Sequence, residues 1–186
     1  DDDFLVAAYS RFEKLRAARG FRTFDDLVVD AVRALEADEA RHGLANRFEH
    51  LIVDEFQDAD HAQFRLLELL AGSRARVTVV GDDDQTIHEW RGARSAFIRG
   101  EFAKRFTAHP HRAFTLSTSF RFGPDLAAAA ERAISAGAGR VAKRIIAADA
   151  EQESRLVAIS ASGKSPAALD PLVDRLKDLQ AQGTPA

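Results

Sequence analysis

Apolar residues in the first part of the chain recur at the spacing of amphipathic helices. Within residues 3–19 and 27–35 the apolar side chains stand three or four positions apart, and Gly20 lies between the two stretches. Thr23 and Asp26 have the separation of a capping box, in which two residues cap each other's backbone at a helix start. We therefore predict that the first forty residues are helical.

Two short aliphatic runs in the middle of the chain indicate strands. The segment 48–53 contains the continuous apolar run Leu51-Ile52-Val53, a second run of β-branched residues covers 77–80, and a leucine-rich helical stretch at 62–70 separates them. Continuous apolar runs of this length are typical of parallel strands that are covered on both faces. The order strand, helix, strand predicts a parallel βαβ unit with a right-handed crossover.

The later part of the chain repeats this mixture of helix and strand patterns. Helices are predicted at residues 95–106, at 124–134 with Pro124 in the first turn, and at 169–179, and a strand is predicted at 156–160. With 46% hydrophobic residues the chain can bury a real core. The predicted fold class is therefore α/β with a parallel sheet.

Composition narrows the classes of protein to consider. The absence of cysteine excludes disulfides, thiol catalysis and cysteine-ligated zinc, and it fits a cytoplasmic location. No apolar run reaches the roughly 20 residues that cross a bilayer, so no membrane partner is expected. The net charge of −3 restricts nucleic-acid contact to local patches. A start at Asp1 and the lack of methionine lead us to expect an internal part of a longer protein.

Carboxylates come shortly after both central strands. Asp54 and Glu55 come after the first strand, and residues 82–84 come after the second. Ligands of parallel sheets bind at the carboxyl ends of the strands. In nucleoside triphosphate hydrolysis one such carboxylate holds Mg²⁺ and its neighbour orients or deprotonates the attacking water, and Asp54 and Glu55 suit these roles in that order. The alternative is that the acidic pair only caps the following helix.

Three segments around these strand ends resemble motifs II, III and IV of the UvrD/Rep family of superfamily 1 DNA helicases, in the right order and spacing. They are LIVDEFQD at residues 51–58, VVGDDDQTIHEWRGA at 79–93 and LSTSFR at 116–121. The chain departs from the family at His88, where tyrosine is frequent, and at Ser119, where asparagine is common. The resemblance implies an incomplete RecA-like motor core of the P-loop NTPase class, with flanking helices.

The resemblance also implies ATP and Mg²⁺ as ligands and assigns roles to four side chains. Asp54 corresponds to the metal ligand, Glu55 to the catalytic base, and Gln85 to the sensor of the γ-phosphate. Arg121 corresponds to the arginine that reaches the γ-phosphate from the second motor domain, a task that suits a planar guanidinium. The structural alternatives are a turn residue for Gln85 and a plain surface arginine for Arg121.

By the same resemblance, the turn after the second strand contacts single-stranded DNA. Trp90 is the only tryptophan, and Arg91 follows it. An aromatic ring stacks on bases without sequence preference. His88 keeps a flat ring that can also stack. A core tryptophan and an ordinary surface histidine are the structural alternatives.

The resemblance divides the chain into residues 1–25, the helical tail of a 1B-like subdomain, residues 26–110, the second half of RecA-like domain 1A, and residues 111–186, the beginning of domain 2A. It implies an ATP-dependent helicase or translocase that moves 3′-to-5′ on single-stranded DNA. Its expected partners are single-stranded DNA, duplex junctions, the rest of the helicase chain, and a repair or nuclease subunit.

The lack of a phosphate-binding loop leaves other functions open. The segment Gly163-Lys164-Ser165 is not a phosphate-binding loop, because Ala158 stands where that pattern needs glycine. The chain alone is therefore predicted to be inactive as an ATPase. A non-catalytic helicase-like module that binds DNA or a partner is one alternative. A metal nuclease that uses Asp54, Glu55, Asp58 and Asp82 is another, but it leaves the later motif residues unexplained.

Overall fold

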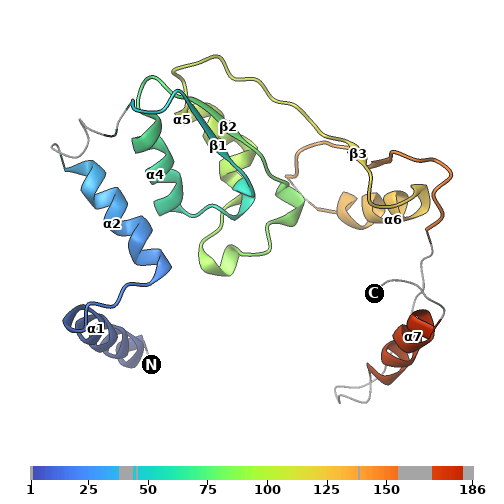
Figure 1. Cartoon of the computed structure of the whole chain (residues 1–186), viewed down its shortest axis with the longest axis horizontal. Coiled ribbons are helices and arrows are strands. Elements are labelled where there is room, and N and C mark those ends of the chain that lie inside the picture. Colours follow the sequence, from blue (N-terminus) through green and yellow to red (C-terminus); the bar gives the residue numbers. More distant parts are fainter. Residues whose placement is uncertain (1, 38–43, 45, 138, 155–168, 182–186) are drawn as a thin grey trace. The chain divides into compact units, whose positions relative to one another are not determined.

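The computed structural model describes residues 2–37, 44, 46–137, 139–154 and 169–181 (Figure 1). The chain divides into two compact units. Unit 1 comprises Asp1–Thr115 with Gly137–Ala142, and unit 2 comprises Leu116–Ala136 with Lys143–Ala186. No helix in the described part of the chain is both long and apolar enough to span a membrane.

Unit 1 begins with the two helices that the apolar spacing predicts. Helix α1 covers Asp2–Ala18 and α2 covers Phe24–Glu36, and Gly20 between them has a φ of +69°, which glycine adopts without strain. The capping box is confirmed, because the Asp26 N–H donates to Thr23 Oγ1 over 3.2 Å and the Thr23 N–H donates to Asp26 Oδ2 over 2.6 Å. This bond from the Thr23 backbone lowers the pKa of Asp26.

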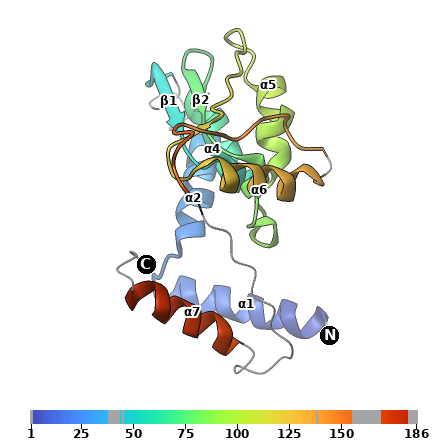
Figure 2. The same cartoon turned by 90° about the vertical axis from the view of Figure 1, so that its right-hand side faces the viewer.

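The centre of unit 1 is the predicted parallel βαβ unit. Strand β1 (His50–Val53) pairs in parallel with β2 (Arg76–Val79), with Val53 opposite Val79. Helix α4 (His61–Ala71) connects them and contacts α2. Figures 1 and 2 show the two strands side by side next to α4. The strand and helix predictions for this region are therefore confirmed, with ends that differ by one or two residues.

The hydrophobic core of unit 1 lies on one face of this sheet. On the other face Ile52 is 77% exposed and Thr78 is also exposed. The prediction that the strands are covered on both faces is therefore wrong for the described residues. Side chains alternate along a strand, so only every second residue faces α4 and the core. The buried core residues are Phe56, Ala59, Phe64, Leu67 and Phe97, and those packed on them are Leu51, Val53, Val77, Val79, Ile98, Phe102 and Phe106.

The helical segment predicted at residues 95–106 contains an irregular turn. Its middle, Phe97–Glu101, is a π-helix, and α5 (Phe102–Arg105) continues it. Apolar spacing cannot reveal a π-turn, because one inserted residue changes the hydrogen bonding without removing the apolar face. Phe97 from this turn stacks on Phe64 of α4, with the ring centroids 4.4 Å apart, and so fastens the segment to the core.

Unit 2 contains a second, smaller parallel sheet. Strand β3 (Thr118–Ser119) pairs with β4 (Ile146–Ala147), and α6 (Pro124–Ser135) runs between them. The predicted helix with Pro124 in its first turn is confirmed, and so is the last helix, α7 (Asp170–Ala181). The predicted strand at 156–160 and the segment 163–165 lie outside the described residues. The described chain is thus a mixed α/β structure with two small parallel sheets.

Candidate functional site

Parallel pairing brings the two acidic strand ends to one edge of the sheet. The Val80 N–H donates to the Val53 carbonyl over 2.8 Å, and the Phe56 N–H donates to the Val80 carbonyl over 2.9 Å. The pairing thus continues past the last strand residues into the segments that carry the carboxylates. This confirms the prediction that the two segments lie together at the carboxyl ends of the strands.

A left-handed residue lies two positions after the end of β1. Glu55 has a φ of 50°, which a residue with a side chain adopts only at a cost of about 1–3 kcal/mol. A 3-10 turn, Phe56–Asp58, follows at once. The two carboxylates therefore do not alternate as they would in a straight strand. Instead the Glu55 N–H donates to Asp54 Oδ1 over 2.9 Å, and both side chains are exposed.

Gln57 connects the two strand ends, a role that sequence reasoning missed. Its side chain is 2% exposed; Nε2 donates to Glu55 Oε2 over 2.7 Å, and Oε1 accepts the Asp82 N–H over 3.0 Å. The fit is close, because a Cβ at Gly81 would lie 2.5 Å from Gln57 Oε1. A neutral amide among carboxylates was the only available signal, since an amide donates and accepts at once.

The bonds of Gln57 continue into the turn that carries Gln85. Gln85 Nε2 donates to Asp82 Oδ2 over 2.7 Å, and the Asp84 N–H donates to Asp82 Oδ1 over 3.1 Å. Glu55, Gln57, Asp82 and Gln85 therefore form one hydrogen-bonded series, which we call the Glu55–Gln85 series. The structure thus connects two of the predicted catalytic residues, with Glu55 at one end and Gln85 at the other.

Two arginines and a backbone N–H donate hydrogen bonds to the two carboxylates that follow Asp82. Asp83, whose side chain is 3% exposed, accepts from Arg99 Nε over 3.2 Å and from the Val141 N–H over 2.7 Å. Asp84 accepts from Arg140 Nε over 3.0 Å and from Arg140 Nη2 over 2.7 Å. The bond to Asp84 raises the pKa of Arg140.

The Asp54 and Glu55 carboxylates have no such partner. Among the described residues, neither forms an ion pair with a lysine, arginine or histidine. Exposed carboxylate oxygens without a cationic partner fit Mg²⁺, which keeps several waters and takes one or two carboxylates. The four carboxylates of the nuclease alternative do not gather; the only described group whose ligand atoms lie within 4.8 Å of one another is Asp82, Asp83 and Asp84.

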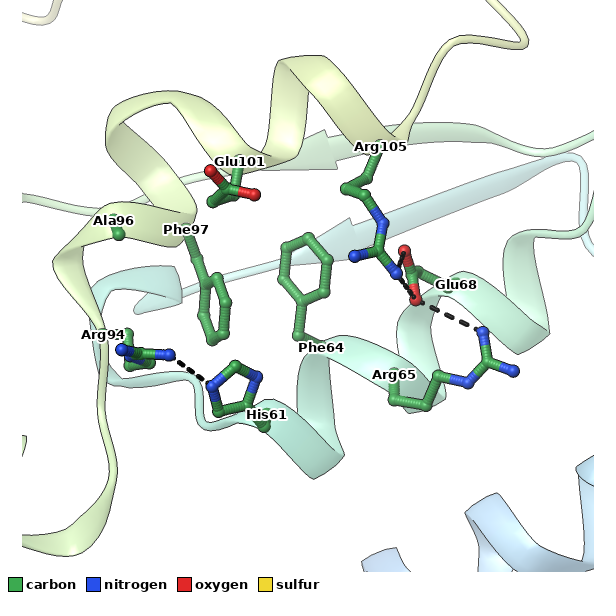
Figure 3. A pocket seen from close by; sticks show the side chains of 9 residues that line it. All are labelled: His61, Phe64, Arg65, Glu68, Arg94, Ala96, Phe97, Glu101 and Arg105. Atoms are coloured by element: carbon green, nitrogen blue, oxygen red, sulfur yellow. Dashed lines mark hydrogen bonds and ion pairs between the residues drawn. The ribbon is translucent and has the colours of Figure 1, made fainter.

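Two cavities of similar size flank α4, and only one contains predicted site residues. Asp54 and Glu55 line a cavity of about 380 Å³ together with Leu66 and Leu70 of α4. The other, also about 380 Å³, lies between α4 and α5. Figure 3 shows its stacked aromatic rings and the arginines that hold Glu68. The first cavity therefore adjoins the predicted carboxylates Asp54 and Glu55, but Gln85 does not line it.

The predicted DNA-contacting residues, His88, Trp90 and Arg91, lie in a turn, three to six positions after Gln85. Trp90 is 79% exposed, so the alternative of a buried core tryptophan is wrong for this structure. The Arg91 guanidinium lies 5.8 Å from the Trp90 ring centre, and the His88 ring lies 6.4 Å from it. His88 is half-buried, and its Nδ1 has no hydrogen-bond partner in the described part of the structure. The turn thus presents one exposed aromatic face beside a cation.

Arg121 belongs to the other unit. It follows β3 in unit 2, its N–H donates to Ser119 Oγ over 3.3 Å, and it is exposed. Glu55 and Gln85 belong to unit 1. The role of Arg121 at a γ-phosphate therefore stays a prediction.

Comparison with known proteins gives a consistent result. A family model described as the UvrD/REP helicase N-terminal domain matches residues 1–107. The matched range includes both acidic strand ends and Trp90, but not Arg121.

Individual relatives are ATP-dependent DNA helicases by name. Rep of Salmonella typhimurium is 43% identical over 94 residues, which cover 50% of this chain and 14% of Rep. UvrD2 of Mycobacterium bovis is 37% identical over 143 residues, which cover 74% of this chain and 20% of UvrD2. PcrA of Staphylococcus aureus is 36% identical over 90 residues, which cover 48% of this chain and 12% of PcrA. The chain thus spans a fifth or less of each of these relatives.

Proposed function

Because the chain belongs to the UvrD/Rep helicase family, we propose that it forms part of the ATP-hydrolysing motor of a DNA helicase. The observation that carries this proposal is the Glu55–Gln85 series. A motor must sense the terminal phosphate of the nucleotide at the place where water is activated. The series joins the side chain suited to activating water with the side chain suited to sensing the phosphate.

In this motor Glu55 is the general base. Gln57 holds Glu55 Oε2, while Glu55 Oε1 has no hydrogen-bond partner among the described residues and is available to a water molecule. As the water oxygen bonds to the terminal phosphorus and the bond to ADP breaks, the water proton passes to Glu55 Oε1. A base that is held at one oxygen loses less freedom when it meets the water.

Asp54 is the residue that we assign to Mg²⁺. Its exposed carboxylate adjoins Glu55 and meets no cation of the described chain. Bound Mg²⁺ would stabilise the negative charge that develops on the phosphates. Gln85 contacts the γ-phosphate, and Arg121 approaches the same phosphate from the second motor domain through its planar set of donors.

The turn that carries Trp90 forms part of the path of single-stranded DNA. The exposed Trp90 ring stacks on a base, Arg91 contacts a phosphate, and the His88 ring packs beside them. Because Trp90 follows Gln85 by only five positions, a change at the nucleotide reaches the DNA through a short stretch of chain. The 3′-to-5′ direction of movement is part of the proposal and rests on similarity to the family alone.

We assign the chain to a RecA-like core of the P-loop NTPase class. Residues 1–25 are assigned to the end of 1B, 26–110 to the second half of 1A, and 111–186 to the start of 2A. The exposed Ile52 face supports this assignment, because a parallel sheet is normally covered on both faces. Among the described residues β1 and β2 pair only with each other, so both edges can accept strands from the rest of the helicase chain.

The function is tested directly by substituting Glu55 in the longer protein, the helicase of which we propose that this chain forms part. Glu55→Gln keeps the size of the side chain and removes the base, so ATP hydrolysis should fall by about 10²–10⁴-fold while nucleotide affinity stays close to that of the parent protein. The matched control is Glu101→Gln, because Glu101 pairs with Lys104 and lies outside the site. Undiminished hydrolysis in Glu55→Gln would show that the base lies elsewhere.

The isolated 186 residues provide the second arm of this test. They contain no glycine-rich phosphate-binding loop with the required spacing, so they should not hydrolyse ATP, with or without DNA. Colorimetric phosphate release in the presence of an oligothymidine strand measures this. DNA-stimulated hydrolysis by the purified chain would overturn the prediction.

A further inference from the structure

A six-residue excursion of the chain belongs to unit 1 and contacts the turn Asp82–Gln85, which we call the acidic turn. Gly137–Ala142 belongs to unit 1, whereas the residues on both sides of it, Leu116–Ala136 and Lys143 onward, belong to unit 2. Gly139 within the excursion has a φ of +70°, a backbone conformation that glycine adopts freely. This excursion is not needed for the proposed chemistry of Glu55, and it has no part in the predicted motifs.

The contacts of the excursion are directed at two neighbouring carboxylates. The Arg140 guanidinium meets both oxygens of Asp84, with Nε 3.0 Å from Oδ1 and Nη2 2.7 Å from Oδ2. This fork-to-fork geometry fixes orientation as well as distance. The next residue, Val141, donates its N–H to Asp83 Oδ2 over 2.7 Å. The side chains of Arg140 and Asp84 are only 15% and 11% exposed, so solvent screens the pair weakly.

The acidic turn depends on such contacts. Asp82, Asp83 and Asp84 hold ligand oxygens within 4.8 Å of one another, and like charges this close repel. Asp83 is buried, where an uncompensated carboxylate is unfavourable. The turn can keep its shape because Arg99 and the Val141 N–H bind Asp83, and Arg140 binds Asp84. Gln85 follows directly, and its bond to Asp82 is made within the same turn.

We propose that Arg140 is a positioning residue for Gln85: by pairing with Asp84 it holds the acidic turn in the geometry that lets Gln85 meet the terminal phosphate of a nucleoside triphosphate. This inference rests on the proposed function. Arg140 itself contacts neither substrate nor metal. It acts from a segment 56 positions further along the chain than Asp84.

The kinetic test uses the longer protein and three variants. Arg140→Gln removes the charge and one fork of donors, Arg140→Lys keeps the charge but not the fork, and Arg112→Gln changes an exposed arginine of unit 1 as a matched control. With DNA present, Arg140→Gln should lower kcat for ATP by about tenfold with a change in KM below about twofold, because Gln85 acts mainly as the phosphate is transferred. Arg140→Lys should lie between Arg140→Gln and the parent, and Arg112→Gln should match the parent.

A double variant shows whether Arg140 acts through Asp84. If it does, Arg140→Gln combined with Asp84→Asn should reduce kcat no further than the more severe single variant, since both remove one interaction. Multiplication of the two losses would overturn the proposal, as would an unchanged kcat in Arg140→Gln. If the role of Arg140 were purely structural, Arg140→Gln would lower thermal stability, and the smaller folded fraction would account for the whole loss of activity. The kcat per folded molecule would then be unchanged, which would also overturn the proposal.

The third readout does not depend on catalysis. In the 186-residue chain, Arg140→Gln should speed amide hydrogen exchange at Asp84 and Gln85, while Arg112→Gln should not. If exchange is faster in the 186-residue variant but the unsubstituted longer protein does not hydrolyse ATP, the proposed function is contradicted while the pairing of Arg140 with the turn stands. Unchanged exchange at both amides would overturn the positioning role whatever the activity of the parent protein.

Discussion

The two acidic segments at the edge of the β1–β2 sheet differ in what balances their charge. After β1, Asp54 and Glu55 are exposed and meet no cation among the described residues. After β2, Asp83 and Asp84 are held by Arg99, Arg140 and a backbone N–H. Both segments looked alike in the sequence, as carboxylates that come shortly after an apolar or β-branched run.

This difference shows that carboxylates at two neighbouring strand ends can have different partners, arginines in one segment and no cation among the described residues in the other. Arginines that already occupy a carboxylate compete with a divalent cation for the same oxygens. An unpartnered carboxylate keeps its oxygens available, and the left-handed Glu55 turns the chain so that the pair stays at the surface. We infer that Asp54 and Glu55 take part in catalysis, whereas Asp83 and Asp84 hold the shape of the turn that carries Gln85.

The largest expected effect separates the two segments by activity. In the longer protein, Asp54→Asn should lower kcat for ATP by at least about 100-fold, because the charge stabilisation by a bound metal is worth several kcal/mol and each 1.36 kcal/mol is a factor of ten. Asp84→Asn, the matched change in the arginine-bound segment, should cost only about tenfold. Equal losses at saturating ATP and Mg²⁺ would remove the distinction between the segments.

A smaller effect is expected from breaking the connection between the segments. Gln57→Ala removes two buried hydrogen bonds, one of them to a carboxylate, and should lower the free energy of unfolding by about 3 kcal/mol. Gln63→Ala is the control, since Gln63 is an exposed capping residue whose loss should cost no more than about 1 kcal/mol. Urea unfolding of the 186-residue chain measures both, and similar losses would mean that Gln57 does not join the segments in solution.

The smallest effect concerns the turn that follows the arginine-bound segment. Trp90→Ala should weaken binding of an oligothymidine strand by about 2 kcal/mol, the typical contribution of one stacked base. Phe114→Ala is a suitable control, because Phe114 is 85% exposed in the same unit and lies outside the motif segments. Fluorescence anisotropy at fixed ionic strength provides the affinities. Equal weakening by both variants would show that general apolar surface, rather than the Trp90 turn, binds the strand.

Much of unit 1 could be predicted because its elements carry strong local patterns. The Thr23–Asp26 capping box, the apolar spacing of α4 and the two aliphatic runs each specify an element within a short window. Strand β4 could not be predicted, because a two-residue strand has too few positions to show a pattern. The π-turn at Phe97–Glu101 was hidden for a related reason, since it keeps the apolar face of a helix.

The candidate site was predictable only in part. The proximity of the two acidic strand ends follows from parallel pairing and was expected. The bridging amide of Gln57 depends on close approach to Gly81, and Arg140 reaches Asp84 from 56 positions away. Contacts between residues so far apart depend on tertiary packing, which no local pattern of charge encodes. The sequence therefore indicated which groups were present better than it indicated which groups neutralise one another.

The most direct test of the central claim asks which acidic segment binds the metal. Electron paramagnetic resonance of Mn²⁺ can be recorded for the longer protein with a non-hydrolysable ATP analogue. We predict a nucleotide-dependent bound Mn²⁺ signal that Asp54→Asn abolishes and that Asp84→Asn retains. A signal that survives Asp54→Asn and disappears in Asp84→Asn would contradict the account, because it would place the metal at the segment that the arginines hold.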